Sequence, residues 1–306
     1  MRGKTFKGGN AGIRAGGRIL LSYLLWPLLL GISIALNYLG MQTAHSVLSF
    51  NASYFLLAGV LCALERLMPH EKQWLQNDGQ IIPDLGHTLI SKSAVQVLIV
   101  LLAVIGLADN VSAEGASWWP RHWPLWGEVV LGLVIAEAGF YAAHRLCHEW
   151  PLLWRFHAVH HSVSRLWFVN TGRFHFMDTL VSVTCGLSLG LSVGMPKEII
   201  VWISTITAYI GLLTHCNIEM RFGALNYFFN TPGLHRWHHS MIPQEGNRNY
   251  GENLMLFDLL LGTFFNSPRQ PPVTIGIHDP MPARFIQQVL HPFRRRIATP
   301  IHSVAV

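Results

Sequence analysis

Long apolar stretches constrain this chain more than any other feature of its sequence. The stretches at 19–39, 50–64, 89–108 and 125–143 are each long enough, or nearly so, for a membrane-spanning helix of ~20 residues. Hydrophobic residues make up 51% of the 306 positions and charged residues 12%, and the mean hydropathy is +0.33. An ordinary soluble domain is less apolar. We therefore predict an all-α, polytopic membrane helix bundle with four transmembrane helices within 19–143.

Two shorter apolar stretches follow, at about 180–194 and 198–214, and they meet at Gly194-Met195-Pro196. Either stretch falls near the lower limit for a full span, so a hairpin that dips into the membrane and a pair of crossings both fit. The sequence contains no long repeat, low-complexity tract or linker rich in Pro, Ser and Gly. A single integral membrane domain over 1–306 is the simplest organisation.

Charge sets the expected orientation. The first 18 residues carry five basic side chains, and no acidic residue precedes Glu65, so the positive-inside rule places the N-terminus in the cytosol. The apolar segment that follows is longer than the core of a signal peptide, which indicates an uncleaved first helix. The net charge of +6 suits contact with anionic lipids, and no nucleic-acid-binding module is visible. Four crossings would return the chain to the cytosol just before His144.

Nine histidines form one ordered pattern beyond that point. Its parts are His144-x3-His148, His157-x2-His160-His161, a lone His215, and His235-x2-His238-His239. Residues three and four apart share a helix face, so each block is expected to aim its imidazoles at one point in space. Histidine is the commonest metal ligand, and imidazole suits Fe, Zn, Cu and Ni. The pattern predicts a site for two metal ions at the cytosolic face.

Glu137 precedes His144 by seven residues and lies on the same helical stripe as His144 and His148. An acidic residue in a membrane segment is usually functional. Three roles fit Glu137: a metal ligand, a partner that orients a histidine, or a buried acid paired elsewhere. The four cysteines form no C-x-x-C pair, and nothing indicates disulfides.

Four linked motifs resemble the fatty acid hydroxylase and sterol desaturase superfamily. They are Tyr141-Ala-Ala-His-Arg-Leu-Cys-His148, Trp154-Arg-Phe-His-Ala-Val-His-His-Ser162, Asn230-Thr-Pro-Gly-Leu-His-Arg-Trp-His-His239 and Asn249-Tyr-Gly251. The resemblance covers roughly residues 80–265. It implies a helical membrane enzyme with a histidine-ligated di-iron centre at the cytosolic side, which uses O2 and reducing equivalents to hydroxylate or desaturate lipids.

The resemblance also implies site residues. His215 matches a lone histidine before the last block, and His175 follows Arg173 where related bacterial sequences often have a histidine. Glu137 and Asp258 are the implied catalytic acids, although Glu137 stands where an Asp is usual and Phe257-Asp258 replaces a Trp-Asp pair. The implied metal ligands are His144, His148, His157, His160, His161, His175, His215, His235, His238 and His239.

Each ligating imidazole needs an acceptor on its other nitrogen to fix its tautomer. The candidate acceptors are Asp178, Glu137, Asn217, Asn230 and Asp258.

Absent motifs exclude several alternatives. The chain has no H-E-x-x-H of zinc proteases, no E-x-x-H of ferritin-like bundles and no G-x-G-x-x-G nicotinamide fingerprint. Electrons are therefore expected from a separate donor protein. Five arginines lie around the motifs and suit donor docking, binding of a substrate headgroup, or contact with lipid phosphates: Arg145, Arg155, Arg165, Arg173 and Arg236.

These features together predict a membrane di-iron oxygenase, an oxidoreductase that hydroxylates or desaturates a lipid C–H bond. Its catalytic region is expected at 144–265, including the membrane hairpin at 180–214. The alternative is a histidine-rich membrane protein that binds or transports metal without oxygenase activity. Transporters usually place polar ligands near mid-membrane, whereas these histidines flank the spans, which favours an enzyme. We expect a bacterial inner-membrane location with the site in the cytoplasm.

Overall fold

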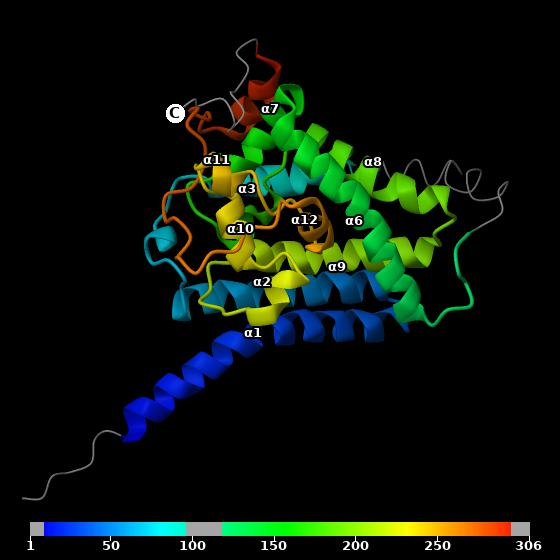
Figure 1. Cartoon of the computed structure of the whole chain (residues 1–306), viewed down its shortest axis with the longest axis horizontal. Coiled ribbons are helices and arrows are strands. Elements are labelled where there is room, and N and C mark those ends of the chain that lie inside the picture. The colour runs from blue at the N-terminus through cyan, green and yellow to red at the C-terminus, as the bar shows by residue number, and fades with distance from the viewer. Residues whose placement is uncertain (1–8, 96–117, 295–306) are drawn as a thin grey trace, which may run out of the picture.

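The computed structural model describes residues 9–95 and 118–294, which fold into helices joined by loops (Figure 1). No strand forms within these ranges, and the extended segments meet only at isolated bridges such as Pro69 with Ile218. The predicted all-α fold is confirmed for this part of the chain.

Four described helices are long and apolar enough to cross a membrane. They belong to α1 (Gly9–Met41), α2 (Ser46–Leu67), α6 (Leu125–Glu149) and α9 (Lys197–His215). Helix α8 (Phe176–Ser192) is apolar but shorter. The chain is therefore an integral membrane protein. Most of the stretch at 89–108, where the sequence predicts a span, lies outside the described residues.

The long helices pack around α9. Helix α1 lies beside α2, both contact α9, and α6 crosses α9 on its way toward α7 (Figure 1). The shared core is built from large apolar side chains on all four helices, including Trp26, Leu61, Leu133 and Trp202. The many exposed apolar side chains of α1 and α2 are what a helix bundle presents to lipid.

Glycines allow α6 to approach its neighbours closely. A Cβ on Gly139 would overlap the carbonyl of Cys185 in α8, and a Cβ on Gly186 would overlap the ring of Phe140. Small residues at such contacts let membrane helices pack backbone to backbone. Helix α8 is thereby fixed along α6.

A short turn joins α8 to α9. Gly194 has φ +80°, a conformation that costs glycine little, and Pro196 directly precedes α9. The turn returns the chain so that the beginning of α8 and the end of α9 lie toward the same end of the molecule (Figure 1).

Short helices gather at that end, around the histidine motifs. They are η1 (Gln73–Leu75), α3 (Ile81–Gly86), the π-helix η2 (His87–Lys92), α7 (Pro151–His161), η3 (Phe168–Gly172), η4 (Gly223–Tyr227), α10 (Pro232–His238), α11 (Pro243–Gly246), α12 (Leu256–Leu261), α13 (Phe285–Leu290) and η5 (His291–Phe293). Among them, α7 packs on α6 and α10 packs on α9.

Candidate metal centre

The nine pattern histidines come together from four helices, α6, α7, α9 and α10, with His239 directly after α10. His144 is half-buried, and the other eight are buried. Their ligand-capable nitrogens fall into two adjacent groups, and the stacked rings of His161 and His239, with centroids 4.5 Å apart, join one group to the other.

The first group contains five histidines: His144, His148, His157, His161 and His238. The Nε2 atoms of His144 and His157 are 3.1 Å apart. The Nε2 atom of His161 lies 3.1 Å from that of His148 and 3.1 Å from that of His238. Nitrogens bound to one transition-metal ion at ~2.1 Å lie at about this mutual spacing.

The second group contains four histidines: His160, His215, His235 and His239. The Nε2 atom of His235 lies 2.9 Å from that of His215 and 3.1 Å from that of His239. His160 stacks on Phe174, with ring centroids 4.1 Å apart, which holds its ring beside the group.

The expectation that each histidine block points at one place is wrong for the two H-x2-H-H blocks. His157 and His161 of α7 face the first group, while His160 faces the second. In α10 the assignment is reversed: the first histidine of the block, His235, lies in the second group, and His238 lies in the first. The reason is helical geometry: residues four apart are separated by ~40° around the axis, whereas residues three apart diverge by ~60° to the other side. Each of these helices therefore lies between the two groups.

Hydrogen bonds fix the tautomers of five histidines. The Nδ1 atom of each donates to an acceptor: His144 to the Tyr250 carbonyl at 2.7 Å, His148 to Asn247 Oδ1 at 3.1 Å, His157 to Asp178 Oδ2 at 2.9 Å, His215 to Asn170 Oδ1 at 2.9 Å, and His238 to the Arg248 carbonyl at 2.8 Å. A neutral imidazole carries one proton, so the Nε2 lone pairs of these five point into the groups. Converging lone pairs in a buried site fit a pair of metal cations.

Burial favours the neutral form of His235 and His239. Desolvation, followed by the neighbouring imidazoles, lowers the pKa of His235 to about 3 and holds the pKa of His239 well below its usual range. Neutral imidazole is the form that binds metal, so the site is prepared for cations at physiological pH.

The acceptors differ from those expected from sequence. Asp178 does accept from a histidine, but the Asn217 side chain instead bonds the backbone of Glu71. Asn170 and Asn247 were not predicted. Asn170 lies in the unremarkable sequence Phe-Val-Asn-Thr, and only its place beside the end of α9 reveals its role.

Glu137 and Asp258 hold the loop that follows Asn249. Glu137 accepts from the backbone N–H groups of Glu252 and Asn253, at 2.6 and 3.0 Å. Asp258 accepts from Tyr250 N and Gly251 N at 2.8 and 2.7 Å. Neither carboxylate is among the groups that could hold a metal. Both anchor the segment whose Tyr250 carbonyl orients His144.

The structure does not bring His175 to the other histidines. Its Nδ1 atom accepts from Met177 N and caps α8, while Nε2 lies 3.1 Å from the Val289 carbonyl. Both ring nitrogens are therefore engaged away from the two groups.

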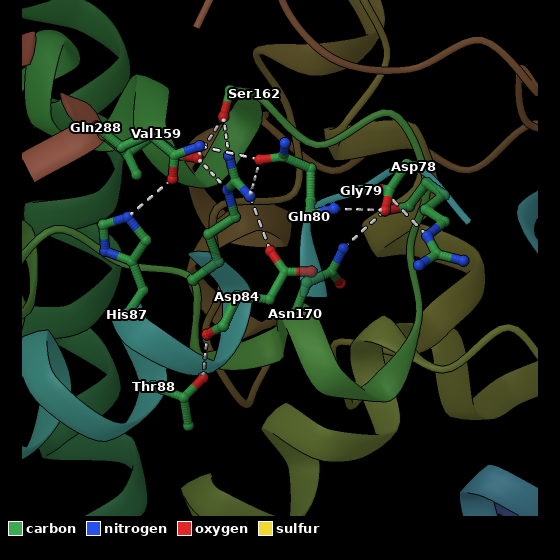
Figure 2. A network of polar contacts seen from close by, with 12 residues as sticks. Asp78, Gly79, Gln80, Asp84, His87, Thr88, Val159, Ser162, Asn170 and Gln288 are labelled. Carbon is green, nitrogen blue, oxygen red and sulfur yellow. Dashed lines mark hydrogen bonds and ion pairs between the residues drawn. The ribbon is translucent and has the colours of Figure 1, made fainter. Parts of the chain in front are cut away.

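A buried polar network fixes α7 to α3. Arg173 pairs with Asp84 at 2.8 Å and also bonds the carbonyl of Val159 and the hydroxyl of Ser162. Figure 2 shows how this network continues through Gln80 to Gln288 of α13. Arg173 is thus a structural residue, and its burial removes it from any docking surface.

Two further motif arginines are also engaged inside the protein. Arg165 bonds the carbonyls of Trp74 and Gln76, and Arg236 bonds the carbonyls of Cys216 and Ile218. The expectation that they contact a donor protein or lipid phosphates is therefore wrong. Arg145 remains at the surface, where it pairs with Glu149.

A cavity of about 190 Å³ lies next to the first group, between α6, α8 and α9. His144, His157 and Asp178 line it. A molecule in this cavity would lie directly beside the candidate metal site.

Comparisons with known proteins agree with this geometry. The family model described as fatty acid hydroxylase matches residues 129–263. The ornithine lipid hydroxylase OlsE of Rhizobium tropici is 46% identical, over 90% of this chain and 85% of its own length. Alkylglycerol monooxygenase of Danio rerio is 26% identical, over 68% of this chain and 46% of its own length. The chain thus spans less than half of the latter protein. No solved structure matches.

Proposed function

Because the chain belongs to the fatty acid hydroxylase family, we propose that it is a di-iron lipid hydroxylase whose substrate is an ornithine lipid. The observation that carries the proposal is the convergence of histidine Nε2 atoms on two adjacent buried points beside a cavity that enters the membrane-embedded helices. The relative with high identity over nearly the whole chain is named as an ornithine lipid hydroxylase, which supports this substrate.

The nine pattern histidines would hold the two iron ions, five around one position and four around the other. Bound iron would supply activation of O2, so that one oxygen atom enters a C–H bond and the other leaves as water, with two electrons and two protons consumed. The neutral imidazoles leave the charge of the metals largely uncompensated, and Asp178 supplies one nearby negative charge through His157.

The protein's own residues orient the imidazoles and enclose the site. Asp178, Asn170 and Asn247 hold the imidazoles of their partner histidines in one tautomer. Glu137 and Asp258 fix the Tyr250 segment against α6. Burial excludes bulk water from the histidines, which protects reactive species from side reactions.

Electrons would come from a separate donor protein, because the sequence contains no nicotinamide fingerprint and no recognisable haem domain. We place the histidine end of the molecule in the cytoplasm and the helices in a bacterial inner membrane. The basic N-terminal segment and the bacterial relative support this orientation and location.

The test combines metal analysis with lipid analysis. Protein purified in detergent is expected to contain about two irons per chain, and cells that express it should accumulate ornithine lipid heavier by one oxygen. Changing both His238 and His239 to Ala should abolish both signals, because one residue is taken from each group. His278→Ala, outside both groups, is the control. Zinc in place of iron, with no lipid change when a reductase is supplied, would instead favour metal binding or transport.

A further inference from the structure

The lining of the cavity changes in character along its length. Helix α8 runs away from the histidines and α9 runs toward them, so residue number orders the lining (Figure 1). Next to His144 and His157 the lining includes the acids Asp178 and Glu252, and at the far end it includes the aliphatic side chains of Leu187 and Ile200.

Four hydroxyl-bearing side chains lie along the cavity from its histidine end, two within one helical turn of α8 and two within one turn of α9, and we call this stretch the hydroxyl level. Thr179 and Ser182 of α8 and Ser204 and Thr207 of α9 all line the cavity. Thr207 stands seven residues beyond Ile200, so it lies ~10 Å along α9 from the aliphatic end. A cavity made only for a hydrocarbon chain has no need of four hydroxyl groups in its lining.

The Thr207 hydroxyl is the informative one. Its oxygen is buried and has no hydrogen-bond partner among the described residues. Threonine in a helix commonly satisfies its hydroxyl on the carbonyl four residues earlier, as Ser33 of α1 does with Leu29. An unsatisfied buried hydroxyl is unfavourable, and a ligand in the cavity that forms a hydrogen bond with it would remove that cost.

We propose that this cavity binds one amphipathic lipid, and that Thr207 determines specificity by hydrogen-bonding an amide or ester group of that lipid. The proposal rests on the proposed function for the identity of the lipid. The chain of the lipid lies along Leu187 and Ile200, and its polar group lies at the hydroxyl level.

The chemistry of the lining selects the kind of polar group. Hydroxyls both donate and accept, which suits a neutral amide or ester. Among the described residues, Asp178 and Glu252 line the cavity and no Lys or Arg does.

The experiment measures binding separately from turnover. Ornithine lipid, which contains an amide, is titrated into the protein as purified in detergent, without reductant so that no turnover occurs, and bound lipid is counted by native mass spectrometry. Thr207→Val keeps the shape but removes the hydroxyl, and should raise the Kd by about fivefold to tenfold. Thr207→Ser should restore binding. Ala208→Leu, which fills the cavity at the same level, should abolish it.

The control is Thr205→Val. Thr205 is also buried in α9, but it lies ~200° around the helix from Thr207 and does not line the cavity. Equal weakening by Thr205→Val and Thr207→Val, or no change with Thr207→Val, would overturn the proposal, as would failure of the wild-type protein to bind the lipid. Tight wild-type binding that depends on Thr207, without any product when reductant and O2 are added, would keep the proposal and reject the hydroxylase function.

Discussion

At the scale of single residues, the candidate metal centre depends on what holds each imidazole in one orientation. A histidine presents Nε2 to a cation only if its proton is held on Nδ1, and Asp178 does this for His157 at 2.9 Å. Cys147 in turn donates to the other oxygen of Asp178 at 3.6 Å. The carboxylate therefore sets both the tautomer and the orientation of a candidate ligand.

Asp178→Asn is expected to weaken metal binding by about 10–100-fold, the usual effect of losing such an outer partner. The amide keeps the volume but loses the charge that strengthens the imidazole as a ligand. Competition of the purified protein against a chelator measures the change. Glu198→Gln, a matched exchange at the exposed start of α9, should bind metal like the wild type. Equal affinities for the two variants would show that Asp178 has no role at the centre.

The buried His87 side chain makes the stability of the protein depend on pH. Its ring is buried beside Gln288 and faces the charge of Arg173 and the ring of His175. Burial first, and then Arg173, lower the pKa of His87 to about 4, against ~6.5 in an unfolded chain. The neutral form therefore stabilises the fold above pH ~6.5, and this contribution is lost as the pH falls from ~6.5 toward 4.

The loss amounts to about 1 kcal/mol at pH 5.5, or roughly 2–4 °C in Tm. His87→Gln removes the titrating group, so the drop in Tm between pH 7.5 and 5.5 should be smaller than in the wild type by that amount. Thermal denaturation at the two pH values measures it. Identical drops would mean that His87 is as easily protonated in the fold as in the unfolded chain.

Sequence predicts which histidines matter better than it predicts what each one does. Spacing alone brings all nine into consideration, because i, i+4 pairs such as His144 and His148 must share a face. It cannot show that His160 turns away from His161, because that depends on where a second group lies. Nor can it separate His175, whose neighbours are Met177 N and the Val289 carbonyl, the latter far away in sequence.

At the scale of elements, the contact between α6 and α8 decides where the cavity can form. Gly139 brings the backbone of α6 against the carbonyl of Cys185, which leaves α8 held by α6 and the cavity open toward α9. Side chains at this contact would push α8 outward together with Asp178. The contact between α6 and α8 therefore supports the hydrogen bond between His157 and Asp178.

Gly139→Ala is expected to destabilise the protein by about 1–3 kcal/mol, as overpacking does, and to lower its metal content. Its Cβ would meet backbone atoms, which cannot move aside as a flexible side chain can. Gly59→Ala in α2 is the control and should stabilise the protein. Nothing lies within 4 Å of its Cβ position, and Ala favours a helix by ~1 kcal/mol over Gly. Thermal midpoints in detergent measure both, and a neutral Gly139→Ala would contradict the close packing.

Apolar length predicts the long helices because burial in lipid depends on composition. The short elements around the site are set by distant contacts instead. Glu65 of α2 accepts from the backbone N–H groups of Phe168 and Asn217, both at 2.9 Å, and so fixes η3 and the segment after α9. Nothing local to those segments reveals this.

At the scale of the whole molecule, the long helices separate the turns that join them from the histidine site, which lies at the opposite end of the molecule. The turns at 42–45 and 193–196 and the start of α6 lie away from the histidines (Figure 1). Thr43 and Asn77 flank the single helix α2 and are both exposed. If α2 crosses the membrane, these two positions must lie on different sides.

Cysteine labelling tests this arrangement. We expect a membrane-impermeant maleimide to label Thr43→Cys and Arg121→Cys in right-side-out vesicles, and Asn77→Cys and Gln270→Cys only in inside-out vesicles. All four positions are exposed, whereas Cys147 and Cys216 are buried and Cys62 and Cys185 half-buried, so the unaltered protein gives the background. The basic N-terminal segment fixes the direction. The reverse pattern would place the histidines outside the cytoplasm, beyond the reach of a cytosolic donor, and labelling of Thr43→Cys and Asn77→Cys from one side would show that α2 does not span.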